Sequence, residues 1–169
     1  MKTRSILLLM VMSLLSVAAM AQKVNVDWKR GEDFTKYKTY AWGVSPHPIK
    51  DPLWNQRIIG FIDDQMTQKG LTKVEPGANP DLIVVYNAGV KQNVSLEGYT
   101  MGGWYNSMST VQQVTTKDGT LVVDMADPTQ KMVIWRGTSS DTLSDKSTKN
   151  IEKVQKMVKK MFEKYPPKN

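Results

Sequence analysis

The sequence has 169 residues, a formal net charge of +7 and no cysteine. The lack of cysteine excludes disulfides, catalytic thiols, Cys-ligated zinc, iron–sulfur clusters and a lipid carried on an N-terminal cysteine. The length suits one domain of ordinary size. The positive charge is local, because the segment from Lys146 to the end carries eight lysines against two glutamates.

The first residues have the pattern of a secretory signal peptide. Lys2 and Arg4 precede an apolar stretch (6–18), and residues 19–21 read Ala-Met-Ala, a small-x-small cleavage site. The apolar stretch is shorter than the ~20 residues of a membrane-spanning helix. We therefore predict cleavage of a signal peptide, residues 1–21, and a single domain, residues 22–169, in the periplasm. An uncleaved anchor is the alternative.

The first half of this domain is predicted to form two strands and a helix. The alternating segment VNVDW (24–28) and the aromatic segment TYAW (39–42) favour strands. Asp51 can cap a helix whose first residue is Pro52, and Gly70 would end it. The apolar side chains at helical spacing between them are Trp54, Ile58, Phe61, Ile62 and Met66.

The next elements are predicted to be a central strand and a three-stranded meander. LIVVYNAGV (82–90) is almost continuously apolar, which favours a strand covered on both faces. Strand-like runs flank residues 117–119, Lys-Asp-Gly, and Asp-Gly is a strong hairpin signal. A second hairpin is predicted at DPTQK (127–131), because proline is common in such turns.

A second helix is predicted near Ser147, with either Asp145 or Ser147 as its cap, and Pro166 would end it. Strands and helices in this order indicate an α+β fold. We expect a mainly antiparallel sheet of about five to six strands, with two helices packed on one face. The apolar stripe expected on the second helix consists of Ile151, Val154, Val158, Met161 and Tyr165.

Several segments together resemble one family of bacterial exported proteins. They are DFTKYKTYAW, LWNQRIIGFIDDQMTQKGL, NPDLIVVYNAGV, GTLVVDMADPTQKMVIWRGTSSDTLSD and KMFEKYPP, in this order. The chain resembles the proteins grouped as domain of unknown function 4136. The resemblance implies an α+β domain in the periplasm or associated with the outer membrane, and it supplies no catalytic residues. Many members look like lipoproteins, from which this chain departs because it has no lipobox cysteine.

No constellation of residues indicates an enzyme or a metal site. His47 is the only histidine and lies between two prolines, without the partners that a metal site or a catalytic triad needs. Asp63 and Asp64 are neighbours on a helix and project about 100° apart, so we expect solvated charges. We predict no catalytic residue, no metal and no cofactor. The carboxylates expected to serve turns and caps are Asp124, Asp127, Asp141 and Asp145.

Two surfaces are candidates for binding. The segment GYTMGGWYNSM (98–108) is richer in aromatic residues and methionine than a passive link needs, although a long hairpin connection is the simpler alternative. The lysine-rich face of the second helix suits an anionic membrane surface, with a solvated face as the alternative. The contact candidates are Tyr99, Met101, Trp104, Tyr105 and Arg136 for a ligand or partner, and Lys149, Lys153, Lys156 and Lys160 for an anionic surface.

Three functions therefore remain open. The first is a non-enzymatic binding or structural module of the cell envelope, which contacts an unknown envelope protein or a small ligand. The second is a hydrolase of envelope polymer, which requires two carboxylates in one cleft, one with a raised pKa. The third is adhesion to an anionic surface through the lysine-rich helix. Nucleic acid is not an expected partner of an exported protein.

Overall fold

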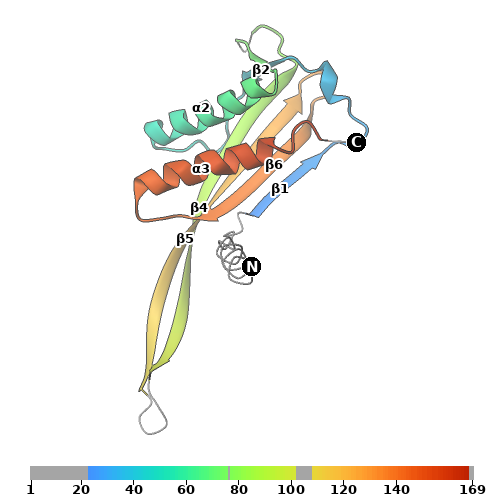
Figure 1. Cartoon of the computed structure of the whole chain (residues 1–169). Helices are drawn as coiled ribbons and strands as arrows, with labels where there is room; N and C mark the ends of the chain where they lie inside the picture. Colours follow the sequence, from blue (N-terminus) through green and yellow to red (C-terminus); the bar gives the residue numbers. More distant parts are fainter. Residues whose placement is uncertain (1–22, 76, 102–107, 168–169) are drawn as a thin grey trace, which may run out of the picture.

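The computed structural model describes residues 23–75, 77–101 and 108–167, without the side chains of 99–101 and 108–110. The described residues form a sheet with two helices packed on one face (Figure 1). The strands are β1 (Lys23–Trp28), β2 (Thr39–Trp42), β3 (Thr72–Lys73), β4 (Leu82–Met101), β5 (Met108–Asp127) and β6 (Met132–Thr142). The helices are the 3-10 helix η1 (Phe34–Lys36), α2 (Pro52–Gln68) and α3 (Ser147–Phe162).

The sheet has six strands in the order β1-β6-β5-β4-β2-β3. The pairs β1/β6, β6/β5 and β5/β4 are antiparallel, whereas β2 pairs in parallel with both β3 and β4. Parallel neighbours need a crossover connection, and α2 provides it between β2 and β3. The predicted α+β class and mainly antiparallel sheet are confirmed, as is the turn between β5 and β6.

Helix α2 begins and ends where the sequence predicts. The Asp51 carboxylate accepts hydrogen bonds from the backbone N–H groups of Leu53 and Trp54, at 2.9 and 3.2 Å. Gly70 follows the helix with φ of +81°, a conformation that glycine adopts without strain. The predicted stripe is confirmed, since Ile58, Ile62 and Met66 are buried and Trp54 and Phe61 are partly buried.

The predicted caps of α3 are wrong. Neither Asp145 nor Ser147 caps the helix with its side chain, and Lys146 occupies the cap position without a side-chain hydrogen bond. Instead, the Asn150 side-chain amide bonds the backbone N–H and C=O of Ser144, both at 2.7 Å. This amide therefore fixes the segment that leads into the helix.

The core lies between the helices and the sheet. The predicted stripe of α3 is confirmed at Val158 and Met161, which are buried, whereas Tyr165 is buried but lies beyond the end of the helix at Phe162. Met157 and Phe162 are buried as well, so the apolar face of the helix is wider than predicted. The Trp135 ring of β6 lies 5.4 Å from the Phe162 ring and 5.6 Å from the Tyr165 ring, between centroids. This aromatic cluster joins α3 to the sheet.

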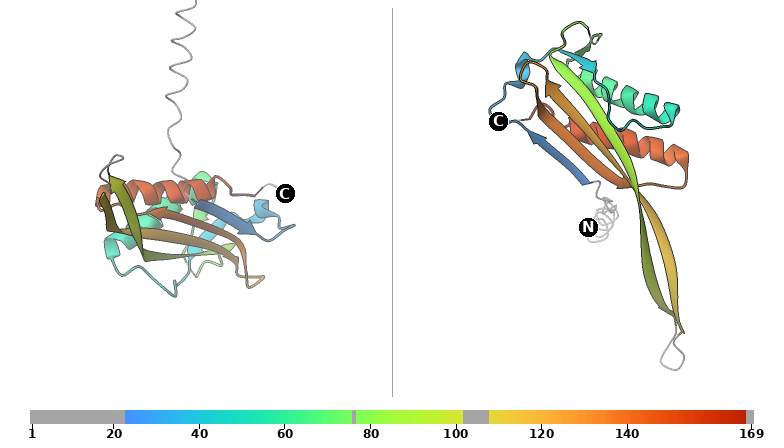
Figure 2. Two further views of the ribbon diagram at one scale, coloured as in Figure 1. Left: turned by 90° about the horizontal axis from the view of Figure 1, so that it is seen from below. Right: turned by 180° about the vertical axis from the view of Figure 1, so that it is seen from behind.

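The prediction that residues 82–90 are covered on both faces is wrong. Both helices lie on the same face, and within the described residues no helix covers the opposite face of the sheet (Figure 2). Along β4, Leu82, Val84 and Tyr86 are buried toward the helices, whereas Ile83 and Val85 are only partly buried. The apolar residues of the open face therefore keep some contact with solvent.

The predicted hairpin at residues 117–119 is also wrong. β5 runs through this segment without a turn. The Asp118 carboxylate instead accepts hydrogen bonds from Asn93 Nδ2 at 2.6 Å and Thr142 Oγ1 at 2.8 Å, on the two neighbouring strands. A Cβ at Gly119 would lie 2.9 Å from Leu143 Cδ2. Asp-Gly thus serves cross-strand bonding and close packing at this position.

Strands β4 and β5 extend far beyond the rest of the sheet as a two-stranded ribbon (Figure 1). We call its residues 91–101 and 108–117 the arm, and the other described residues the body. Lys91 lies opposite Asp118 of the body. From Gln92↔Lys117 to Met101↔Met108, the two strands of the arm pair only with each other within the described part of the chain. No helix in the described ranges is long and apolar enough to cross a membrane.

Candidate ligand-binding site

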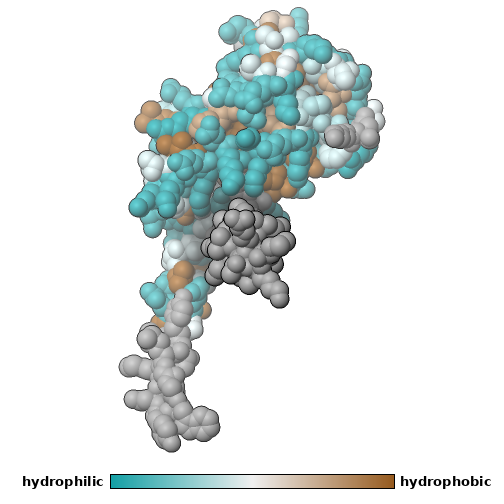
Figure 3. All heavy atoms as spheres, in the orientation of Figure 1, coloured by the Kyte–Doolittle hydropathy of each residue, from teal (hydrophilic) through white to brown (hydrophobic). Residues whose placement is uncertain are grey.

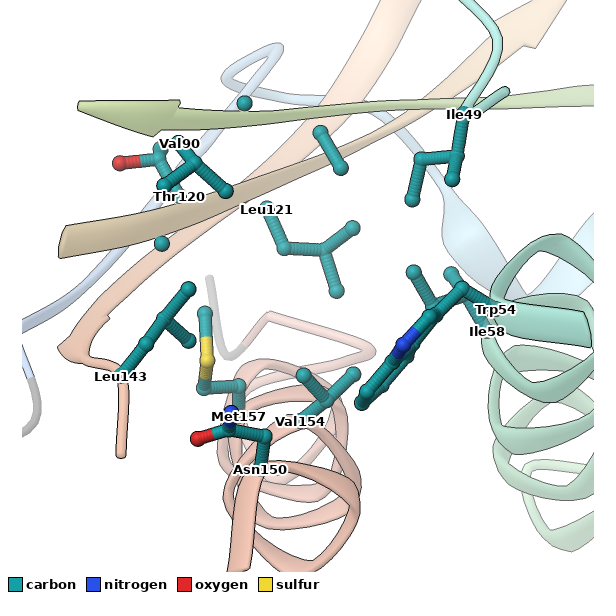
Figure 4. Close-up of a pocket in the computed structure, with 13 residues that line it drawn as sticks. Ile49, Trp54, Ile58, Val90, Thr120, Leu121, Leu143, Asn150, Val154 and Met157 are labelled. Atoms are coloured by element: carbon teal, nitrogen blue, oxygen red, sulfur yellow. The ribbon is translucent and has the colours of Figure 1, made fainter. Parts of the chain in front are cut away.

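A pocket of about 320 Å³ lies between the two helices and the sheet, at the point where the arm leaves the body (Figure 4). Helix α2 contributes Trp54 and Ile58, and α3 contributes Val154 and Met157. Leu143 closes one side, across the space from the Trp54 ring. The other residues that line the pocket are Ile49, Ala88, Gly89, Val90, Gly119, Thr120, Leu121 and Asn150.

The chemistry of this pocket is apolar. None of its lining residues carries a charge; the Trp54 indole has one N–H donor, and Thr120 and Asn150 have polar side chains. Both are already engaged, because the Asn150 amide bonds the backbone of Ser144 and Thr120 Oγ1 lies 3.0 Å from Ser140 Oγ. The pocket therefore offers van der Waals contact to an apolar group and no acid or base.

Small residues of the sheet create the space. On β4 and β5, the cross-strand pairs Ala88↔Leu121 and Val90↔Gly119 face the helices. Ala88 fills little of the volume, and Gly119 leaves room for Leu143 to approach the strand closely. A larger side chain at Ala88 would project into the pocket.

An apolar stripe continues from the pocket along the arm. Val90 lines the pocket and is itself 65% exposed. On the same face of the ribbon follow Val94, Leu96 and Val111, with exposed fractions of 57%, 72% and 67%. We call these three residues the arm stripe. Figure 3 shows hydrophobic surface on the described part of the arm, among hydrophilic side chains.

A second cluster, of buried polar groups, lies at the end of the sheet away from the arm. Glu32 and Asp127 are only 6% and 5% exposed. The Tyr37 hydroxyl lies 3.0 Å from Glu32 Oε1 and 2.9 Å from Asp127 Oδ2, and Gln130 Nε2 donates to both carboxylates. Lys36 Nζ lies 2.6 Å from Glu32 Oε1. This cluster connects the loop after β1 to the β5–β6 turn.

Both carboxylates of this cluster are held in their ionised form. The ion pairs with Lys36 and Lys29 lower the pKa of Glu32 to about 2. Burial alone would raise the pKa of Asp127, but hydrogen bonds from Gln130, Tyr37 and Thr129 outweigh it and lower that pKa to about 2. A general acid needs a raised pKa, so this pair does not match the requirement of the hydrolase hypothesis.

The candidate residues near the tip of the arm are only partly described. Trp104 and Tyr105 lie outside the described residues, which leaves that part of the contact hypothesis as a prediction. Tyr99 and Met101 are in β4, and their side chains are not described. Arg136 lies in β6 on the open face, where its Nε and Nη2 bond the Asp124 carboxylate at 2.5 and 2.8 Å. The structure does not bring Arg136 to the pocket.

The four candidate lysines of α3 do not share one environment. Lys149 and Lys156 are exposed, whereas Lys153 and Lys160 are partly buried. Lys153 Nζ pairs with Asp141 Oδ1 at 3.3 Å and also bonds the carbonyl of Thr142. Lys153 thus anchors the helix to the end of β6, and the exposed charge of this face is smaller than the spacing suggests.

The remaining ionisable candidates, His47 and Asp63, differ in their surroundings. His47 lies exposed in the loop before α2. Asp63 is not the solvated charge that we predicted, because it accepts hydrogen bonds from Tyr40 Oη at 2.7 Å and Trp42 Nε1 at 2.9 Å. Among the described residues, no group of three His, Cys, Asp or Glu side chains is placed to hold a metal ion.

Comparison with known families identifies the family of the chain. The model of the family described as "Domain of unknown function (DUF4136)" matches residues 24–167. The chain belongs to this family. The DUF4136 match covers both the body and the arm. Among curated proteins, no sequence matches the chain.

Solved structures show the same fold at low sequence identity. A PDZ domain protein from Parabacteroides distasonis is 18% identical, with a TM-score of 0.57 over 94% of the DUF4136 chain. The chain spans only 40% of the length of that protein. The PelC dodecamer from Paraburkholderia phytofirmans is 9% identical, with a TM-score of 0.50 over 83% of this chain and 94% of that one. At these identities the similarity shows the fold alone.

Sequence reasoning did not find the pocket. Trp54 and Val154 were correctly placed on apolar helix stripes, but nothing in those stripes distinguishes the lining of a pocket from a filled core. Gly119 offered a signal, because a glycine inside a strand often marks a close approach. However, Asp118 precedes this glycine, and the Asp-Gly pair is typical of a hairpin turn.

Proposed function

We propose that this DUF4136 domain is a non-enzymatic binding module, whose pocket at the base of the arm holds an apolar group. The uncharged lining of a space of about 320 Å³ supports this proposal best. Ligand pockets start at roughly 300 Å³, so this one suits a short acyl chain or a single ring system. Binding would rest on the burial of apolar surface, at roughly 25 cal/mol per Å².

The proposed place of action is the periplasm. The basic residues, the apolar stretch and the Ala-Met-Ala site at the N-terminus support export with cleavage after Ala21. An apolar ligand there would be a membrane-derived or externally supplied molecule. N-terminal sequencing of the protein recovered from the periplasm should begin at Gln22, and an intact N-terminus would contradict cleavage.

A titration with acyl chains of different lengths tests the pocket. N-phenyl-1-naphthylamine serves as the fluorescent probe, and straight-chain fatty acids of about six to twelve carbons displace it. We expect saturable probe binding and a preference for one chain length, because the pocket is finite. Absence of saturable binding by any of these probes would contradict the proposal.

Two matched variants locate the binding. Ala88→Leu adds three carbons toward the pocket and should weaken probe binding about ten-fold or more. Ala126→Leu adds the same atoms on the open face, where Ala126 pairs with Ile83, and should leave binding unchanged. Thermal melts of both variants verify folding. Equal binding by the two variants would show that the probe binds elsewhere.

A further inference from the structure

The outer edge of β4 has a strand neighbour only over a short stretch. β2 pairs with Leu82–Val84, and beyond Val84 the described part of the chain places no strand beside this edge. Unpaired N–H and C=O groups on such an edge form a template for another strand. The arm also has no proline and no register shift that would blunt it.

The hydrogen bonds of the body determine which groups point outward. The carbonyl of Val84 accepts a hydrogen bond from Gly43 N–H at 2.8 Å, so the backbone groups of Val84 point away from β5. Strand geometry alternates with a period of two, and the β4–β5 register is unbroken. Gln92, Val94 and Leu96 therefore also direct their N–H and C=O groups outward.

A second hydrogen bond, on the β5 side of the ribbon, gives the same assignment of outward-pointing backbone groups. Leu143 N–H donates to the Lys117 carbonyl, at 2.6 Å, so the backbone groups of Lys117 point away from β4. Gln92 is the cross-strand partner of Lys117. Such a pair exchanges no backbone hydrogen bonds, and both residues point outward from the ribbon.

We propose that the arms of two copies of this chain pair edge to edge, β4 against β4 in antiparallel orientation, around a two-fold axis at Val94. Closed two-fold dimers are the commonest symmetric assemblies, and added strands satisfy the backbone of an exposed edge. Val94 then faces its own copy, and Leu96 lies diagonal to it. The arm stripes of the two copies become one continuous apolar surface.

Charge determines the register. Lys91 and Glu97 are both exposed and project from the same face of β4. With the axis at Val94, Lys91 lies directly opposite Glu97 of the second copy, twice by symmetry. An axis at Asn93 would place Lys91 opposite Ser95, and an axis at Ser95 would place it opposite Tyr99. Only the register at Val94 brings opposite charges together, which stabilises a cross-strand pair.

Charge reversal of the exported protein tests the register. Sedimentation velocity should show a monomer–dimer equilibrium for the wild type. Lys91→Glu and Glu97→Lys should each raise the dimer dissociation constant about ten-fold, because each places like charges opposite one another twice. The double variant should return it close to the wild-type value. A wild type that stays monomeric up to millimolar concentration would overturn the proposal, as would a double variant without recovery.

Proline variants test the edge. Gln92→Pro removes an outward N–H of β4 and leaves the bonds within the arm intact, so it should abolish the dimer. Gln113→Pro removes an outward N–H on the opposite edge of the arm and is the matched control, expected to dimerise normally. Thermal melts report whether each variant is folded. Equal dimerisation by both variants, or loss in Gln113→Pro alone, would overturn pairing through β4.

Discussion

The two halves of β4 have the same apolar face but different neighbours. In the body, Leu82 and Val84 are fully buried beneath the helices. In the arm, Val94 and Leu96 lie on the same face of the same strand and are mostly exposed. On this face of β4, apolar side chains continue from Leu82 and Val84 in the body to Val94 and Leu96 in the arm. Burial is therefore decided by what packs on the strand, and the helices end before the arm begins (Figure 1).

This difference in burial indicates that the body accounts for the stability of the fold and that the arm is available for binding. The body has a buried core and the polar cluster around Tyr37, so its side chains hold the fold together. An isolated two-stranded ribbon is only marginally stable in water, and none of the described side chains of the arm belongs to the core. Substitutions in the body should act mainly on unfolding, and substitutions in the arm mainly on association.

The largest expected effect is in the aromatic cluster of the body. Phe162→Ala removes a fully buried ring that packs against Trp135 and Tyr165. It should lower the free energy of unfolding by about 3–5 kcal/mol, through lost burial and the cavity left behind. Urea unfolding followed by circular dichroism measures this. A loss below about 1 kcal/mol would mean that the body collapses readily around the gap.

A smaller loss is expected in the polar cluster. Tyr37→Phe removes the hydroxyl that bonds both Glu32 and Asp127, and keeps the ring. The two buried carboxylates then lose the O–H donor that lies within bonding distance of both, so we expect a cost of about 1–3 kcal/mol. The matched control is Tyr86→Phe, whose hydroxyl bonds the single amide of Asn55. If both variants lose the same stability, the cluster has no special role.

The same cluster makes stability depend on pH. The pKa values of Glu32 and Asp127 are about 2 in the folded chain, below the usual values near 4 of unfolded carboxyls. The folded state thus binds fewer protons, and its stabilisation is complete above pH ~4 and lost as the pH falls toward 2. Thermal melts between pH 7 and 2 should show this decline, and Glu32→Gln should make it shallower. An unchanged slope in that variant would assign the decline to other groups.

Helices and strands were predicted correctly from the sequence where interactions between residues close in the chain determine them. Asp51, Pro52 and Gly70 determine the ends of α2, because a cap and a glycine act within a few residues. The α+β arrangement followed from the order of such elements. The stripes on both helices were found for the same reason, since helical spacing alone defines a face.

Predictions from the sequence failed where the local structure depends on contacts with residues that are distant in the chain. Asp118 and Gly119 have the pattern of a turn, yet Thr142 at the end of β6 and Leu143 just after it contact them within a continuous strand. The pocket was missed for a related reason. Whether Trp54 fills a core or borders a space depends on the small side chain of Ala88 on another element. Such pairings between elements leave no local pattern in the chain.

The smallest effect on unfolding is expected in the arm stripe. A substitution there tests most directly whether the arm acts on association and the body on stability. Val94→Thr keeps the β-branched shape that suits a strand but replaces a methyl group with a hydroxyl at a side chain that is 57% exposed. At concentrations where the protein is monomeric, the free energy of unfolding should change by less than about 0.5 kcal/mol. A loss above about 1 kcal/mol would show that the arm stripe packs on the body of its own chain. An unchanged monomer with weaker self-association would place the role of this valine in the contact between copies.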